Sequence, residues 1–271
     1  MASGKGFSLK DQLFNREKVR YLAGLFYDAD ALFDAEGFEA TVMETMLDLE
    51  LKARMHLIAE VLEHFLPQDF ATAASRIEAA LPPPLDPTKT DDDFGLFIFG
   101  SLGEFVANNG LKNLPVALPL LREITQRSSM EFAIRHFLIA AQDETMIELE
   151  SWLTHDHYHV RRLVSEGTRP MLPWGLKTGL DIRDPLSFLD ALHADSTRFV
   201  TRSVANHLND ISKKDPALVV DTLVKWQRLG LQDPAELNWM TRHALRGLIK
   251  KGDAKALALL GYQQDPQISV T

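Results

Sequence analysis

The sequence predicts an all-α protein built as a HEAT-like helical-repeat solenoid, an α-α superhelix, and three observations support this fold class. Apolar residues recur at helical spacing along most of the 271 residues. No apolar–polar alternation is long enough for a sheet. A short pattern recurs every forty residues and places Arg162, Arg202 and Arg242 at equivalent positions. Stacked helix pairs of the HEAT kind have such a period and present a long concave face to large ligands.

Prolines divide the front of the chain into amphipathic helices. Pro67 ends one helix and the prolines at 82–84 end the next, because proline cannot continue a helix. Residues 82–93 hold four prolines and three consecutive aspartates, which predicts a stiff acidic linker. The helices expected before this linker span residues 14–27, 41–66 and 70–81.

The linker is the best candidate for a domain boundary. We expect residues 1–90 to form an N-terminal helical segment that packs on the array, and residues 91–262 to form the array with the active site. Residues 263–271 would then be a tail, unless the whole chain is one continuous domain. After the linker, helices are expected over residues 94–109, 115–126, 129–141, 144–154, 158–167, 185–193, 197–212, 216–229, 234–250 and 253–260, with a breaker-rich loop at 167–175.

The composition excludes several classes of protein. Cysteine is absent, which excludes disulfides, thiol nucleophiles and cysteine-ligated metals and predicts a cytoplasmic protein. No signal peptide or run of 18 apolar residues is present, so no membrane contact is expected. The net charge is −9, but residues 1–150 carry −12 and residues 151–271 carry +3. The back half can therefore contact phosphate, although chance unevenness explains this charge split equally well.

Three motifs resemble the bacterial AlkC-type 3-methyladenine DNA glycosylases. They lie at residues 161–174, 202–213 and 125–135, and residues 49–54 fit the same family near its front. The resemblance covers roughly residues 12–262. His136 departs from it, since the family usually has proline there. The chain also resembles the short form of the family, without a C-terminal immunoglobulin-like domain.

The resemblance implies a HEAT-like solenoid whose concave face binds double-stranded DNA with alkylated bases. It further implies a monofunctional DNA glycosylase that hydrolyses the N-glycosidic bond of 3-methyladenine, with 3-methylcytosine as a further candidate, and leaves an abasic site. Such an enzyme needs no cofactor, and its relatives act as monomers at the bacterial nucleoid. The catalytic positions of the family match Glu131, Glu166 and Asp210, and the position that binds the substrate base matches Trp174.

These residue types suit the chemistry. A base methylated at N3 is a cation that leaves as a neutral molecule, so a strong general acid is less necessary than for a normal purine. Trp174 can stack on the cationic ring, and Glu131 and Glu166 can flank it. Asp210 can hold the attacking water beside the sugar and oppose its developing positive charge.

Each of the four residues also has a purely structural explanation. Trp174, between a proline and a glycine, could anchor its loop. Glu166 could pair with Arg162 four residues earlier, and Glu131 with Arg135 in the same way. Asp210 could bond locally near the end of its helix. Only the context of the motifs favours the functional assignment.

Basic residues at the matched and repeated positions are candidate phosphate contacts, because the planar guanidinium group suits phosphate. Solvated surface charge explains some of them equally well. The candidates are Arg162, Arg169, Arg202, Arg242, Arg246 and Lys250.

Other kinds of function have weaker support. His155, His157 and His159 alternate as metal ligands on a strand would, but they lie at the start of a helix, so we expect no metal site. Two rivals to the glycosylase remain open. One is a non-catalytic HEAT-like scaffold, and the other is a relative that binds DNA structures and has lost excision.

Overall fold

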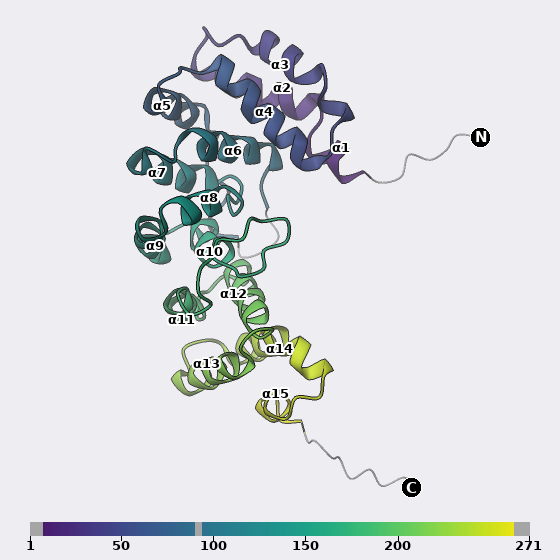
Figure 1. The fold of residues 1–271 in the computed structure, drawn as a ribbon, viewed down its shortest axis with the longest axis vertical. Helices are drawn as coiled ribbons and strands as arrows, with labels where there is room; N and C mark the ends of the chain where they lie inside the picture. The colour runs from purple at the N-terminus through teal and green to yellow at the C-terminus, as the bar shows by residue number, and fades with distance from the viewer. Residues whose placement is uncertain (1–7, 90–93, 263–271) are drawn as a thin grey trace, which may run out of the picture. The chain divides into compact units, whose positions relative to one another are not determined.

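The computed structural model describes residues 8–89 and 94–262, and it confirms the all-α fold class. Within these ranges the secondary structure consists of helices, with a single isolated β-bridge between Gly95 and Ser128 (Figure 1). No helix in the described ranges is long and apolar enough to cross a membrane.

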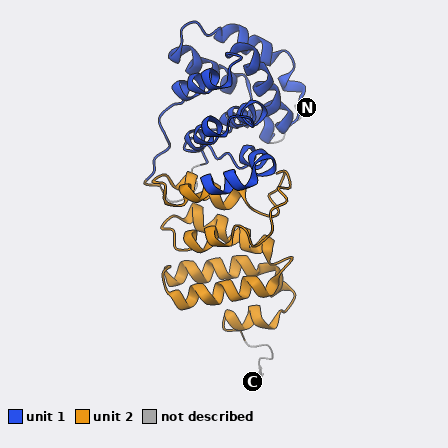
Figure 2. Cartoon of the chain, turned by 60° about the vertical axis from the view of Figure 1, so that its left-hand side comes forward, with its two compact units in different colours: residues 1–87, 93–148 blue, residues 88–92, 149–271 orange. Residues whose placement is uncertain are grey.

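The chain divides into two compact units, each of which is described here by itself (Figure 2). The first comprises residues 1–87 and 93–148, and the second comprises residues 88–92 and 149–271. The helices around residues 100–140 group with the front of the chain in this division, and the predicted boundary near residue 90 stays a prediction. The tail predicted at 263–271 lies outside the described residues.

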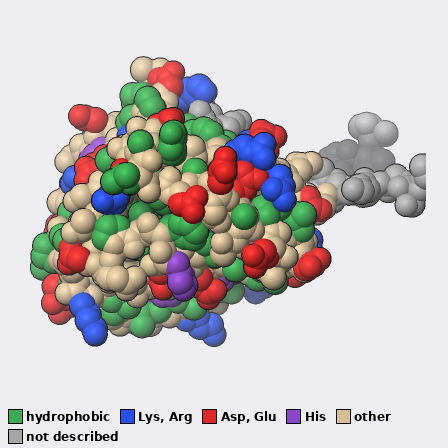
Figure 3. Space-filling model, turned by 90° about the horizontal axis from the view of Figure 1, so that it is seen from above, with side chains coloured by type: hydrophobic (Ala, Val, Ile, Leu, Met, Phe, Trp, Pro, Cys, Tyr) green, Lys and Arg blue, Asp and Glu red, His purple; other side chains and the backbone are tan. Residues whose placement is uncertain are grey.

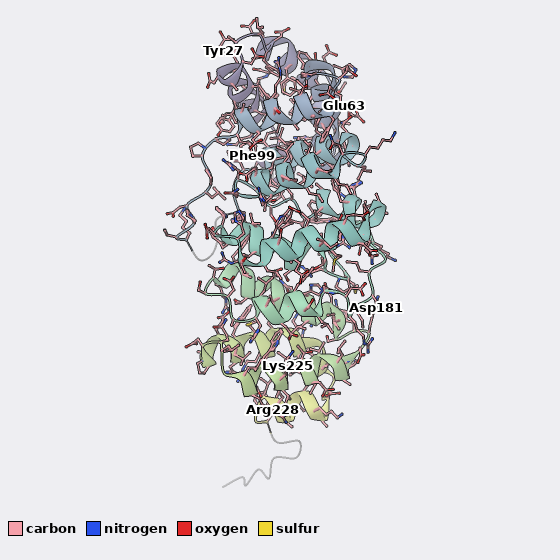
Figure 4. All side chains as sticks on the ribbon, turned by 90° about the vertical axis from the view of Figure 1, so that its left-hand side faces the viewer. Tyr27, Glu63, Phe99, Asp181, Lys225 and Arg228 are labelled. Atoms are coloured by element: carbon pink, nitrogen blue, oxygen red, sulfur yellow. The ribbon has the colours of Figure 1, made fainter. Side chains whose placement is uncertain are left out.

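Capping side chains define the helix starts of the first unit. Asn15, Asp34 and Asp69 each accept a hydrogen bond from a backbone N–H in the first turn of the helix that follows. The core of this unit is largely apolar, and Phe99, labelled in Figure 4, is 2% exposed. The helices are α1 (Leu9–Leu13), α2 (Arg16–Ala29), α3 (Ala35–Met43), α4 (Leu51–Phe65), α5 (Phe70–Ala80), α6 (Gly100–Asn109), α7 (Leu114–Thr125), α8 (Ala133–Ala140) and the start of α9 (Gln142–Ser151), with 3-10 turns η1 (Met46–Asp48) and η2 (Phe97–Phe99).

The single helix predicted over 41–66 is wrong. The structure has two helices there, α3 and α4, with η1 and an extended Leu49 between them. The fully buried Arg54 explains the break. Its guanidinium donates to the carbonyl oxygens of Leu47 and Leu49, at 2.9 and 3.0 Å, and also to Phe14 O at 2.7 Å. These carbonyl groups bond to a side chain instead of continuing a helix.

Gly103 lets α6 approach the segment that carries Glu131. A Cβ atom at this position would lie 2.5 Å from Met130 Sδ and 3.2 Å from Ala133 Cβ. The segment just before α8 therefore packs directly against the backbone of α6.

On the face seen in Figure 3, acidic side chains lie scattered among apolar and basic ones, without one continuous patch of either sign.

In the second unit, α10 and the helices after it begin and end close to the predicted residues. Asp215 and Asp233 cap α13 and α14, each of which has proline in its first turn, and Gly230 ends α13 in the left-handed conformation. Figure 4 labels Lys225 and Arg228 on α13. The elements are η3 (Trp152–Thr154), α10 (Tyr158–Gly167), α11 (Leu186–Leu192), α12 (Arg198–Ile211), α13 (Pro216–Leu229), α14 (Pro234–Lys250) and α15 (Ala254–Leu259).

The forty-residue repeat corresponds to three helices that pack side by side. α10 packs against α12, and α12 packs against α14. Direct contacts join these helices: Ser203 Oγ lies 3.0 Å from Ser165 Oγ, and Asn209 Nδ2 donates to Ala244 O at 2.9 Å. Residues about forty apart in the sequence are therefore neighbours in space.

Candidate active site

Two of the predicted acidic residues meet inside the second unit. Glu166 lies in the last turn of α10 and is 5% exposed, and Asp210 lies in the last turn of α12 and is 2% exposed. Both are held by the guanidinium of Arg169, which follows α10. Arg169 Nη1 donates to Glu166 Oε1 at 2.6 Å, and its Nε and Nη2 lie 3.0 and 2.9 Å from Asp210 Oδ2.

Glu166 is surrounded by groups that favour its charged form. Ser203 Oγ donates to its Oε2 at 2.6 Å, and Arg162 Nη2 lies 3.5 Å from its Oε1. Burial by itself would raise the pKa of Glu166. The charges of Arg162 and Arg169 and the hydrogen bonds outweigh that effect and hold this pKa below its usual range. Glu166 is therefore an ionised carboxylate in a buried position.

Asp210 has a second cation on its other oxygen. Lys213 Nζ lies 3.2 Å from Asp210 Oδ1, and the same nitrogen lies 3.9 Å from Met171 Sδ in the loop that follows α10. Arg169 and Lys213 thus balance the buried charge from two sides. A buried carboxylate with both oxygens engaged by cations keeps a fixed orientation.

Arg169, a predicted phosphate contact, is buried between the two carboxylates. It is 8% exposed, and the two carboxylates raise its pKa above the usual range against the opposing effect of burial. That phosphate contact stays a prediction. What the geometry shows is a guanidinium that fixes the distance between Glu166 and Asp210.

Trp174 lies in the loop after α10, and its side chain is 72% exposed. Its φ of 59° is in the left-handed region, which is uncommon for any residue other than glycine. Gly175 follows, where a Cβ atom would lie 2.8 Å from the side chain of Leu172. The loop therefore presents a large aromatic ring to solvent instead of burying it as an anchor.

Glu131 belongs to the first unit, where it is half-buried in the segment between Ser128 and α8. The close approach of Gly103 to Met130 fixes this segment against α6. Lys52 of α4 lies next to it, with its Nζ 5.3 Å from the centre of the Phe132 ring. The predicted role of Glu131 beside the base stays a prediction.

The predicted phosphate contacts of the second unit differ in their surroundings. The guanidinium groups of Arg162 and Arg202 lie over one ring, that of Phe199, at 4.6 and 5.7 Å from its centre. Arg242 Nη1 donates to the hydroxyl of Tyr262 at 2.7 Å. Arg246 and Lys250 are exposed on α14. All five remain candidates for DNA contact.

The histidines that were considered as metal ligands take part in local packing. His155 Nδ1 accepts from His157 N at 3.0 Å, and His157 Nδ1 accepts from His159 N at 3.2 Å and so caps α10. The His159 ring packs 4.7 Å from that of Phe199. Over the described ranges, no group of acidic or histidine side chains is arranged to hold a metal ion.

Sequence reasoning missed the groups that support these carboxylates. Ser203 and His207 lie inside a matched motif but were not selected, and His207 Nδ1 lies 3.0 Å from Ser165 O. A signal was present: small polar residues at positions 165 and 203 interrupt the apolar sides of two helices that the repeat pairs. Lys213, two residues after the end of α12, was not assigned to the site either.

Comparison with known proteins finds similar sequences and a similar fold. The model of a protein family described as DNA alkylation repair enzyme matches residues 115–248, which include every predicted site residue except Lys250. An uncharacterized protein of Bacillus subtilis strain 168, YhaZ, is 32% identical over 263 residues, which are 96% of this chain and 70% of that protein.

A solved structure is also similar. It is the alkylpurine DNA glycosylase AlkC of Pseudomonas fluorescens, bound to DNA that contains an abasic-site analogue. The similarity has a TM-score of 0.81 at 33% identity and covers 94% of this chain and 68% of the other. Sequence and fold therefore agree over nearly the whole chain.

Proposed function

Because the chain belongs to the family of DNA alkylation repair enzymes, we propose that it is a monofunctional DNA glycosylase that removes cationic N-methylated bases. Its first substrate would be 3-methyladenine in double-stranded DNA, with 3-methylcytosine as a further candidate. The observation that carries this proposal is the bridge of Arg169 between the buried Glu166 and Asp210. Two carboxylates at a fixed separation match the needs of a reaction that passes through a sugar cation.

The reaction breaks the bond between the sugar C1′ and the base nitrogen. The bonding electron pair leaves with the methylated base, which becomes neutral, and the positive charge moves to the sugar. Asp210 would oppose this charge and accept the proton of the water that attacks C1′, and the product would be an abasic site. Glu166 would favour the cationic lesion over neutral adenine, and the exposed ring of Trp174 would stack on it. For Glu131, in the first unit, the same role stays a prediction.

The position of Lys213 supports a hydrolytic reaction without strand cleavage. Its Nζ lies 3.2 Å from Asp210 Oδ1, and this contact holds the side chain against the carboxylate instead of leaving it to attack C1′. Cleavage of the strand would need a neutral amine that forms an imine with the abasic sugar. Borohydride reduction of the reaction mixture should therefore trap no covalent complex with DNA.

The proposed activity is tested by incubating the purified protein with methylated genomic DNA and separating the released bases by chromatography. Release of free 3-methyladenine supports the proposal. Tight binding to methylated DNA without release would instead indicate a relative that has lost excision. If the protein neither binds DNA nor releases bases, a scaffold role becomes the better explanation.

A further inference from the structure

Asn206 and His243 face each other beside the candidate site. His243 lies on α14, and its Nε2 is 2.7 Å from Oδ1 of Asn206 on α12. Asn206 comes one helical turn before Asp210 on the same side of α12. Since an amide oxygen can only accept, Nε2 must be the protonated nitrogen of the ring. The glycosidic reaction proposed above uses neither residue.

Stacking on Trp239 holds the His243 ring in place. The ring centres lie 4.8 Å apart, with 20° between the ring planes. The guanidinium of Arg198 lies 3.4 Å from the centre of the same indole and pairs with Glu236. A ring fixed in this way fixes the amide that it contacts.

This contact determines which end of the amide is left for a ligand. Asn206 Oδ1 is taken by His243. Among residues 8–89 and 94–262, no group accepts a hydrogen bond from Asn206 Nδ2, and the side chain is only partly buried. Asn206 therefore presents two N–H donors on the side of α12 that also carries Arg202 and Asp210.

The charges around this amide select an anion. Burial lowers the pKa of His243, and the positive charges of Arg246, Arg198, Arg169 and Arg202 lower it further, to about 4. The ring is thus neutral at neutral pH and gives its one N–H to Asn206. Arg169 is already paired with Glu166 and Asp210, and Arg198 with Glu236, so Arg202 and Arg246 supply the further positive charge near this ring.

We propose that Asn206, oriented by His243, binds one phosphodiester group of the DNA strand next to the sugar that faces Asp210; this inference rests on the proposed glycosylase function. A phosphate offers only acceptors, which match the two amide donors. An adenine edge does not match, because asparagine reads adenine with its oxygen and its nitrogen together, and the oxygen is already used. A phosphate held one turn from Asp210 would place the adjoining sugar against the carboxylate.

The test measures binding without requiring base release. The probe is a duplex with a tetrahydrofuran abasic-site analogue, and a set of related duplexes replaces one phosphate at a time near the analogue by an uncharged methylphosphonate. Dissociation constants are measured at fixed salt for the wild type, Asn206→Ala and the matched control Asn238→Ala, an exposed asparagine of α14. Asn206→Asp keeps the shape of the side chain and serves if the alanine variant does not fold.

The wild type should lose about tenfold in affinity at one methylphosphonate position, as expected for a hydrogen bond to a charged group. Asn206→Ala should bind the unmodified duplex about tenfold more weakly and lose nothing further at that position. Asn206→Asp should bind more weakly still, because its charge repels phosphate, and Asn238→Ala should match the wild type.

Two results would overturn the inference: equal sensitivity of wild type and Asn206→Ala at every linkage, or no measurable binding of the wild type to any duplex. Base release is scored separately. If Asn206 is coupled to one phosphate but no base is released, the proposed activity is wrong and the phosphate site is supported. If bases are released but no phosphate is coupled to Asn206, the activity is supported and the phosphate site is wrong.

Discussion

The hydroxyl group of Ser203 donates a hydrogen bond of 2.6 Å to Oε2 of Glu166, and this bond joins α12 to α10. Glu166 therefore depends on the neighbouring repeat for its hydrogen bonding as well as on its own helix.

Ser203→Ala removes a donor to a buried charge. We expect a loss of about 1.5–3 kcal/mol in the free energy of unfolding, because hydrogen bonds to charged groups are the stronger ones. The pKa of Glu166 should rise toward its usual range. As the pH is lowered, the variant should therefore lose excision at a higher pH than the wild type does. Urea unfolding and the pH profile of excision measure both effects. Ser75→Ala, at an exposed hydroxyl that bonds only to its own helix, should change neither.

Asp210→Asn tests the carboxylate beside the sugar. The amide keeps the shape of the side chain but cannot oppose the positive charge of the sugar, so excision should fall by about 100-fold or more. Single-turnover release of 3-methyladenine measures this rate, and binding to the abasic-analogue duplex should stay nearly unchanged. Asp221→Asn, at an exposed position of α13, is the control. Near-wild-type excision by Asp210→Asn would contradict the proposed role of Asp210 in the reaction.

Arg169→Ala leaves two buried carboxylates without their shared cation. We expect the free energy of unfolding at neutral pH to drop by about 3–5 kcal/mol, as when one partner of a buried ion pair is removed. The loss should shrink as the pH falls, because protonation then relieves the unpaired charges. Chemical denaturation at several pH values measures this. Arg183→Ala breaks an exposed pair with Asp215 and should cost about 1 kcal/mol or less, and a similar cost for both variants would contradict the assignment.

His243 predicts a dependence of stability on pH. Its pKa is about 4 in the folded protein and 6.5 in the unfolded chain, so the unfolded chain binds more protons between these values. The contribution of this residue to the free energy of unfolding is complete above about pH 6.5 and is lost as the pH falls toward 4. His243→Gln should flatten the measured curve in that window. His64→Gln, on the surface of α4, should leave the slope unaltered.

Arg242 and Lys250 lie on the exposed side of α14 and are expected to meet phosphates without reading bases. Replacing either by alanine should weaken binding to all duplexes alike, and it should reduce the slope of log affinity against log salt by about 1. Fluorescence anisotropy over a range of salt concentrations measures this slope. An effect confined to lesion-containing DNA would argue for a role in recognising damage instead.

The sequence predicted the helices and their repeat well, because periodic apolar residues and terminal caps are local signals. The ends of α10, α13 and α14 match the predicted residues. The break before α4 could not be predicted, since it depends on the carbonyl groups of Leu47 and Leu49, which bond to the side chain of Arg54 instead of to the backbone of a helix. The pairing of Asn206 with His243 was also missed. The forty-residue period brings their helices together, but only the rotation of each helix shows which side chains touch.

The bridge by Arg169 restricts how the chain can change length. One residue inserted in α12 between Ser203 and Asp210 would turn the end of the helix by about 100°, since an α-helix has about 3.6 residues per turn. Ser203 would stay on Glu166 while Asp210 swung away from Arg169. An insertion in the loop between Gly175 and α11 would turn neither helix. Natural variants should therefore gain or lose residues in that loop and keep the interval from Ser203 to Asp210 constant.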